Sequence, residues 1–553
     1  MKWHKIERKD NMKKTTAMMA ASLMIMSLVL GGCGTTGAAT SAATAAVETE
    51  AETQVQTDAA QDSAAQTDAA ETEAVQTDAA QDSEAQADTT AGSTTTKIPS
   101  AEEIEITETI ENNTDEEHAI TADGEEASYS NVAVVKTGEA EGDEADFYGA
   151  NAAIFATNGA TLTLSEITVN TDGKHANGVF SYGEGTTVNI SDSVIETTGN
   201  CSGGLMTTGG GTMNASNLLI HTTGNSSAAI RSDRGGGTVN VTGGSYTTEG
   251  TGSPVIYSTA DITVSDAEME STASQGVVVE GQNSVTLNNV NLTANNVTKN
   301  SNKSEWYQAV MIYQSMSGDA DEGLASFAMN GGTLTNLNGD IFFVNNTMAT
   351  IDLTGATIVN EDEEGVFLRA AAAGWGSDGS NGGHVTMNAS GQNIDGDMIV
   401  DEISSLNLYL KDSSSFSGAI NSDGAGGDIY VEIEDGSTWT LTGDSYITSL
   451  TCSAGSINLN GHKLYVDGEE YAEGTASEGE AIVVETTSSG GHGGHGGGTP
   501  PEKPGNGSGG HGGDGSEPPA KPGSGSAGPG GDGSEPPAKP DGDNSEPPAK
   551  PGE

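Results

Sequence analysis

Basic residues, aromatic residues and cysteines are all scarce in this chain. Only 20 lysines and arginines stand against 80 acidic residues in the 553-residue sequence, which gives a formal net charge of −60. Such a polyanion does not bind nucleic acid through phosphate contacts, because those contacts need clustered basic side chains. Strong helix formers are also few beside the 77 glycines and the many Thr, Asn and Ser residues, which argues against an ordinary helical enzyme.

The chain has no apolar run long enough for a comfortable membrane span, which needs about 20 residues. A shorter run, 17–30, follows the basic Met12-Lys13-Lys14 and ends in Leu-Gly-Gly-Cys33. This order is typical of a secretory signal, with Met12 as the expected start. The ending resembles the lipobox of bacterial lipoproteins, and that resemblance implies lipidation of Cys33 and a folded part held outside the cell on the bacterial membrane.

Composition divides the chain into four segments. Residues 1–33 form the predicted signal, and 34–100 form an acidic linker of Ala, Thr and Gln that is too polar to fold. Residues 476–553 are rich in Gly, Pro and His and are also predicted to be disordered. Only 101–475 is expected to fold.

An internal repeat dominates the foldable segment. Four copies keep three landmarks in constant phase: an apolar position, a glycine and a second apolar position. The first apolar landmark is spaced by 26, 25 and 26 residues, and apolar residues within each copy alternate with a period of two. The landmarks are Leu162, Val188, Met213 and Val239; Gly173, Gly199, Gly224 and Gly250; and Val179, Leu205, Ile230 and Ile256.

Short strands separated by Gly, Asn, Asp and Ser clusters predict an all-β fold, a parallel β-helix of about 13 coils flanked by the two disordered segments. Later copies are expected to begin at Ile262, Val285, Phe327, Ile351, Val385, Leu406 and Ile429. Cys201 and Cys452 then lie about ten coils apart, roughly 48 Å at 4.8 Å per coil. This is too far for a disulfide between them, so we predict two free thiols.

The repeat resembles the right-handed β-helices of the pectin-lyase-like superfamily. The last segment, 437–467, is similar to the passenger rods of autotransporter adhesins, and 146–155 with 175–180 resembles adhesin-like β-helix surface proteins of Firmicutes. These resemblances imply the fold and an adhesin class, and they say little about activity.

Two spacings between copies exceed one coil and therefore predict outward loops. The expected loops are 295–308 with Trp306 and Tyr307, 317–323 with Asp319 and Asp321, and 370–383 with Trp375. Counted in step with the regular copies, the loop at 295–308 precedes the strand aligned with Val179, and the other two loops follow that strand. The three loops should therefore flank one face of the β-helix on both of its edges.

Alternation places a second set of side chains outward on that face. An aromatic stripe there would suit stacking on sugar rings or docking of a protein, although a turning of several side chains inward is the simpler alternative. The candidates for the stripe are Phe180, Met206, Arg231, Tyr257, Met311, Phe342 and Phe367. With the loop residues, this gives Trp306, Tyr307, Trp375, Phe342, Phe367 and Arg231 as candidate ligand-binding residues.

Other motifs give weaker signals. A Thr/Asn column including Asn189, Asn214 and Asn240 is expected to be structural, with an ice-binding or glycan-binding face as the alternative. No paired carboxylates or histidine motif complete a polysaccharide-cleaving site, and no catalytic residue is assigned. Asp319 and Asp321 are weak Ca²⁺ candidates, and His492 and His495 are weak metal candidates in the tail, so no cofactor is expected beyond a tentative calcium ion.

The sequence thus predicts a lipid-anchored, extracellular β-helix that acts as an adhesin, presenting an extended rod to glycans, matrix or a host surface. Two other readings stay open: a polysaccharide lyase or glycoside hydrolase on the same scaffold, and a passive surface spacer. Enzymatic activity is uncertain at this level, and its absence is favoured.

Overall fold

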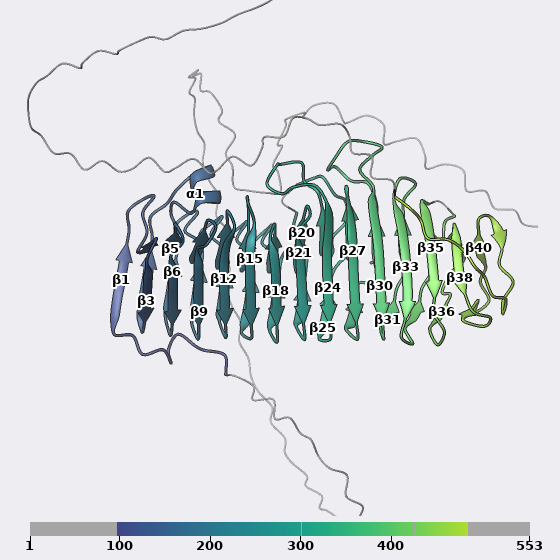
Figure 1. Ribbon diagram of the computed structural model, residues 1–553, viewed down its shortest axis with the longest axis horizontal. Coiled ribbons are helices and arrows are strands. Elements are labelled where there is room, and N and C mark those ends of the chain that lie inside the picture. Colours follow the sequence, from purple (N-terminus) through teal and green to yellow (C-terminus); the bar gives the residue numbers. More distant parts are fainter. Residues whose placement is uncertain (1–96, 300, 425, 485–553) are drawn as a thin grey trace, which may run out of the picture. The chain divides into compact units, whose positions relative to one another are not determined.

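The computed structural model describes residues 97–299, 301–424 and 426–484. They form a right-handed parallel β-helix, as predicted, in which three parallel sheets run alongside one another (Figure 1). Each of the first ten coils contributes one strand to sheet A, one to sheet B and one to sheet C, in that order along the chain, and the last coils have no strand in sheet A. Sheet C has 13 strands, which agrees with the predicted number of coils.

Sheet A holds ten strands: β1 (Glu108–Asn112), β4 (Val132–Lys136), β7 (Thr168–Thr171), β10 (Val194–Thr197), β13 (Leu219–Thr222), β16 (Ser245–Thr248), β19 (Glu268–Ser271), β22 (Asn291–Ala294), β25 (Thr333–Asn336) and β28 (Thr357–Asn360). Sheet B holds eleven: β2 (Ile120–Asp123), β5 (Ile154–Thr157), β8 (Val179–Tyr182), β11 (Leu205–Thr208), β14 (Ile230–Ser232), β17 (Ile256–Ser258), β20 (Val277–Glu280), β23 (Gln308–Tyr313), β26 (Asp340–Asn345), β29 (Leu368–Ala370) and β32 (Met398–Val400).

Sheet C consists of β3 (Glu126–Ser130), β6 (Thr161–Ser165), β9 (Thr187–Ser191), β12 (Gly211–Ser216), β15 (Gly237–Thr242), β18 (Asp261–Ser265), β21 (Ser284–Asn288), β24 (Leu324–Asn330), β27 (Thr347–Thr354), β30 (Gly383–Ser390), β33 (Ser405–Lys411), β35 (Asp428–Ile433) and β38 (Ser449–Cys452). The last coils add two small sheets: β31 (Asn393–Asp395), β34 (Ser415–Ser417), β36 (Thr438–Thr440) and β39 (Ile457–Asn458), then β37 (Ser445–Ile447), β40 (Leu464–Val466) and β41 (Glu469–Glu470). The helix α1 (Asp143–Tyr148) lies between β4 and β5.

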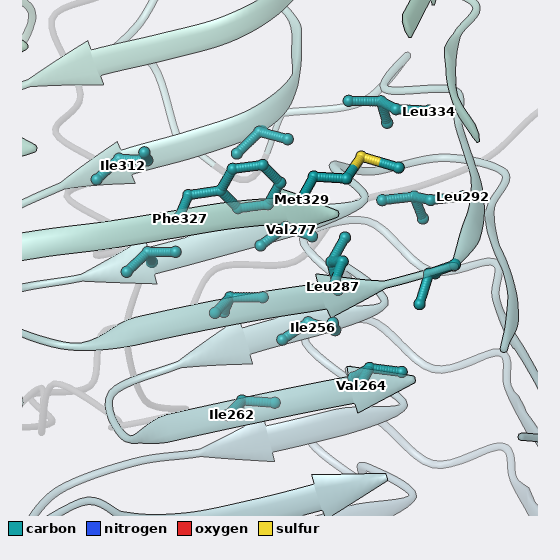
Figure 2. Close-up of a cluster of buried hydrophobic side chains, with 14 of the residues drawn as sticks. Ile256, Ile262, Val264, Val277, Leu287, Leu292, Ile312, Phe327, Met329 and Leu334 are labelled. Carbon is teal, nitrogen blue, oxygen red and sulfur yellow. The ribbon is translucent and has the colours of Figure 1, made fainter. Parts of the chain in front are cut away.

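The predicted landmarks stack as expected. Leu162 pairs with Val188, and the same register continues through Met213 to Val239. Four later starting positions, Ile262, Val285, Phe327 and Ile351, continue this column. The last three predicted starts, Val385, Leu406 and Ile429, lie two residues too early, because Ile351 pairs with Met387 and the column continues through Leu408 to Val431. Figure 2 shows such inward side chains, among them Ile262, Phe327 and Ile312, which fill one continuous core between the three sheets.

The corner between sheet C and sheet A is a tight turn with one residue in the left-handed conformation. Asn and Asp tolerate this conformation better than other residues with a side chain, because their short polar groups hydrogen-bond locally. The turn is reinforced between coils, since Asn217 Nδ2 donates to Asp192 Oδ1 at 2.7 Å. The residues at this corner include Asp192 (φ 50°), Asn217 (φ 51°), Asp266 (φ 55°) and Asn289 (φ 54°).

The repeated glycines of the second landmark are required by close approach of the stacked backbones. A Cβ atom on Gly199 would lie 2.0 Å from the carbonyl oxygen of Gly173, and one on Gly224 would lie 1.9 Å from that of Gly199. No real Cβ atom comes so close to a backbone oxygen, and a backbone oxygen cannot rotate away. The glycine spacing therefore reports the point where successive coils touch.

Candidate binding face over sheet B

The outward side of sheet B is covered by inserted segments. The three predicted loops are present and connect β22 to β23, β23 to β24 and β29 to β30. Helix α1 covers the same side nearer the first coils: Thr208 Oγ1 donates to the carbonyl oxygen of Phe147 at 2.7 Å, and the Phe147 ring lies 3.7 Å from the Arg234 guanidinium carbon. Helix α1 was not predicted from the sequence, although the coil that holds it is longer than its neighbours: Val134 pairs with Val169, 35 residues further along the chain, whereas Val169 pairs with Ile195, only 26 residues further.

The outward column on this face differs from the predicted stripe. Phe180, Met206, Arg231 and Tyr257 do share one register, and Met311 continues it, but all of them are buried by the covering segments. The column then passes to Phe343 and Arg369. The placement of Phe342 and Phe367 in the stripe was wrong, since both rings pack inside the core against one another, with centroids 5.5 Å apart.

The two loop tryptophans lie on this face, but their indole rings are covered by other side chains. The half-buried Trp306 ring has the Arg369 guanidinium 4.6 Å from its centroid and the Phe343 ring 5.6 Å away. Trp375 is 2% exposed and packs edge-on against Tyr313. Stacking of a sugar on either indole would require one of these contacts to open.

A small polar cavity lies where the loop before β23 meets the loop after β29. The backbone N–H of Gly374 donates to the carbonyl oxygen of Lys303 at 2.6 Å and joins the two loops. The cavity has a volume of about 20 Å³, room for about one water molecule. Its lining includes Asn296, Gln308, Trp306 and Trp375.

Three atoms in the lining of this cavity are buried without a hydrogen-bond partner among the described residues. They are Asn296 Oδ1, Gln308 Oε1 and Trp375 Nε1. The orientation of the Asn296 amide is fixed, because its Nδ2 donates to the carbonyl oxygen of Gln308 at 3.1 Å. Two acceptors and one donor on residues that line one cavity complement a water molecule or a hydroxyl group, and leaving them unpaired is costly.

A buried ionic network lies beside the cavity, under the loop between β23 and β24. Arg231 donates to Asp233 at 2.6 Å, and Arg234 binds Asp319 through its Nε and Nη2 atoms at 3.0 and 2.8 Å. Arg231 is thus a buried ion-pair partner and not the surface residue that the sequence suggested. Asp319 is 5% exposed, and its carboxylate is held by a guanidinium, whereas Asp321 is exposed.

Glu280 is the centre of the second half of this network. Its carboxylate accepts hydrogen bonds from the hydroxyl groups of Tyr257, Tyr313 and Ser315, and the side chain is fully buried. Burial raises the pKa of Glu280 above its ordinary value. Burial likewise raises the pKa of Asp233 to about 6, although the Arg231 charge opposes this shift.

These raised pKa values predict a pH dependence of stability. A carboxyl group with a raised pKa in the folded state holds its proton more tightly there than in the unfolded chain, so stability is lost as pH rises from about 4 through 6. Because burial raises the pKa of Glu280 in the folded state, we expect Glu280→Gln to gain stability relative to the wild type as the pH rises above the ordinary pKa of a glutamate. Urea denaturation of both proteins at a series of pH values measures the difference. If the free energy of unfolding of both proteins depended on pH in the same way, Glu280 would not have a raised pKa in the folded state.

A third buried cluster lies beneath α1. His175 Nδ1 is 2.9 Å from Asp146 Oδ1, and both side chains are fully buried. The possible ligand atoms of Asp146, His175 and Cys201 lie within 4.8 Å of one another. Cys201 is disulfide-bonded, so the cluster offers no thiolate to a metal. The prediction of two free thiols is confirmed for Cys452, which is free and buried, and is wrong for Cys201.

Several predicted features lie outside the described residues. These are the signal segment with Cys33, the acidic linker up to residue 96, and His492 and His495 in the tail. Within the part of the chain that the structure describes, no helix has the length and apolar character needed to cross a membrane.

Comparison with known proteins yields no relative. No protein-family model matches the chain, no curated protein matches it, and no solved structure matches it. The arrangement of this chain's own residues is therefore the basis for assigning a function.

Proposed function

We propose that this chain is a cell-surface binding protein of the adhesin class, whose β-helix presents the covered face of sheet B to a glycan, a matrix component or a host surface protein. The observation that carries the proposal is the polar cavity between the two joined loops. Its unpaired Asn296, Gln308 and Trp375 atoms are ready to bind one hydroxyl-sized group from a ligand. Display of many copies on one surface would multiply weak contacts.

The local charge supports a ligand at this place. Lys299 and Lys303 stand at the cavity in a chain with a strongly negative total charge. Lys303 forms no ion pair with a described residue, and its Nζ lies 5.8 Å from the centroid of the Trp375 ring. A basic group without an anionic partner at the rim of a polar cavity suits hydrogen bonding to a ligand oxygen.

Binding arrays test this proposal. The full-length chain is expected to bind at least one member of an array of glycans and extracellular-matrix proteins. Trp375→Phe removes the indole N–H and keeps an aromatic ring, so it should weaken that binding by about tenfold, the effect of losing about 1.4 kcal/mol. Lys463→Ala, an exposed change near the last strands, serves as the control. Unchanged binding by Trp375→Phe would show that the cavity is not part of the ligand site.

One observation favours a polysaccharide-cleaving enzyme as a second candidate. Glu280 is a carboxyl group with a raised pKa beside two tyrosines, and such a group can act as a general acid. However, Glu280 is fully buried beneath the loop that follows β23, so a substrate would reach it only after that loop moved. Release of soluble sugars from polysaccharide, abolished by Glu280→Gln, would favour the enzyme over the adhesin. If the chain shows neither binding nor cleavage, the interpretation as a passive surface spacer remains.

A further inference from the structure

Sheet C carries an open groove on its outward side, on a different face from the loops. The groove crosses β6, β9, β12 and β15 and has a volume of about 350 Å³. This volume lies in the range of ligand sites, about 300–1,000 Å³. Its lining residues on each strand belong to two neighbouring outward columns and to the backbone between them.

Every outward position on these four strands is Thr, Ser or Asn, and none of these side chains is buried. Three columns result: Thr161, Thr187, Thr212 and Thr238; Thr163, Asn189, Asn214 and Asn240; and Ser165, Ser191, Ser216 and Thr242. Neighbouring columns are about 7 Å apart along a strand, and successive rungs about 4.8 Å apart. A chain with a net charge of −60 thus keeps this patch free of charge.

The central column is held rigid and still has hydrogen-bonding capacity. Asn214 Nδ2 donates to Asn189 Oδ1 at 3.0 Å, and Asn240 Nδ2 donates to Asn214 Oδ1 at 3.0 Å. Each amide has two N–H donors and two acceptor sites, so the ladder leaves one of each per rung for a ligand. None of the hydroxyl groups in the three columns donates to a described residue. The ordered array lowers the entropic cost of binding.

The same face already holds an extended chain at its other end. The segment 479–482 crosses from β38 to β33 and is bound by outward side chains of sheet C. Asn407 binds the backbone of Ile482 on both sides, accepting its N–H at 2.8 Å and donating to its carbonyl oxygen at 3.0 Å. Ser449 accepts the N–H of Glu480, and Thr451 accepts the N–H of Gly479 and donates to its carbonyl oxygen. Outward Asn, Ser and Thr side chains of this sheet can therefore hold a polymer that runs across the strands.

The chemistry of the groove identifies the polymer. Nucleic acids and acidic glycans are disfavoured by the charge of the chain. A separate peptide or protein partner, unlike the covalently attached segment 479–482, would need apolar or aromatic pockets for its anchoring side chains, and the groove offers none, since Leu164, Ile190 and Ala215 point into the core. The groove instead offers uncharged hydrogen-bond donors and acceptors that repeat from coil to coil. They complement the hydroxyl groups of an uncharged sugar chain.

We propose that the groove on sheet C between β6 and β15 is a second binding site, which takes an extended, uncharged polysaccharide running along the stack of coils. It is independent of the face over sheet B. Contacts repeat with each coil, so longer chains of the same polysaccharide should bind more tightly than short oligomers.

The test uses the full-length chain with insoluble cellulose and chitin and with soluble mannan and β-glucan. At least one polysaccharide should bind. Ser216→Phe places a ring in the groove without touching the Asn ladder and should weaken binding at least tenfold. Thr247→Phe puts the same ring on the outward side of sheet A, one coil away, and should leave binding unchanged. Asn214→Thr, which keeps a strand-compatible polar residue but interrupts the ladder, should weaken binding less than Ser216→Phe does.

Several results would overturn the assignment. Absence of binding to all four polymers would do so, as would equal losses in Ser216→Phe and Thr247→Phe. Binding removed by Trp375→Phe instead would place the sugar on the face over sheet B. Binding that is unaffected by Trp375→Phe supports the groove even if the proposed ligand of the sheet B face is never found. If the wild-type chain inhibits ice growth, Ser216→Phe abolishes that inhibition and no polysaccharide binds, the outward face of sheet C binds ice and the polysaccharide assignment is wrong.

Discussion

Replacement of Gly199 by alanine is expected to lower the free energy of unfolding by about 3 kcal/mol, at the upper end of the usual cost of overpacking. The added Cβ would lie 2.0 Å from the carbonyl oxygen of Gly173, and only a shift of the backbone can relieve that contact. The shift would also disturb the next coil, because Gly199 in turn approaches Gly224. Urea or thermal denaturation of the purified chain measures the effect.

A matched control separates close approach from the general effect of removing a glycine. Gly159 has φ +77° and no atom within 4 Å of an added Cβ, so Gly159→Asn should change stability by less than about 1 kcal/mol. Similar losses in the two variants would show that the coils do not touch at Gly199.

Arg231→Met is expected to cost about 3–5 kcal/mol, because it leaves the fully buried Asp233 carboxylate without its cation. Part of this loss should disappear near pH 5, where Asp233, whose pKa burial raises to about 6, can take up a proton. The free energy of unfolding at pH 5 and pH 8 tests both statements.

Two further variants show whether the loss comes from the unpaired charge. The double variant Arg231→Met with Asp233→Asn should recover most of the stability, since the asparagine oxygen can still accept the backbone N–H of Arg234. Arg234→Met should also lower stability, because the Asp319 side chain, 3% exposed, would lose the guanidinium that pairs with it. If the double variant is as unstable as the single one, the loss is due to packing and not to charge.

The regular coils could be predicted from the sequence because each landmark has a local physical cause. Alternation of apolar residues marks the inward positions, and the glycine spacing marks the contact between backbones. These causes recur in every coil, so counting from Leu162 stayed in register as far as Ile351. Across the insertion before β30 the count slipped by two residues, since Ile351 pairs with Met387 and not with Val385. The three loops were also predicted, because an insertion shows itself as an excess over the repeat length.

The same counting failed for the outward side of sheet B. Across the insertions, the short strands of this sheet have only a few residues, and an error of one residue exchanges the two faces. Phe342 and Phe367 were placed outward by such an error, whereas Phe343 and Arg369 occupy the outward column. A phenylalanine suits either side here, because the covering loops make the outward side as apolar as the core.

By itself, the sequence determined the β-helix, its number of coils, the positions of the loops and the uncharged columns of sheet C, because all of these follow from short-range periodicity. Only the tertiary structure decided which groups the loops bring together: the polar cavity at Trp375, the Arg231–Asp233 pair and the Glu280 cluster. These contacts join residues from different coils and insertions, and Arg234 and Asp319, for example, are 85 residues apart. No local pattern in the chain encodes such a pairing, since it depends on how each loop folds back over the sheet.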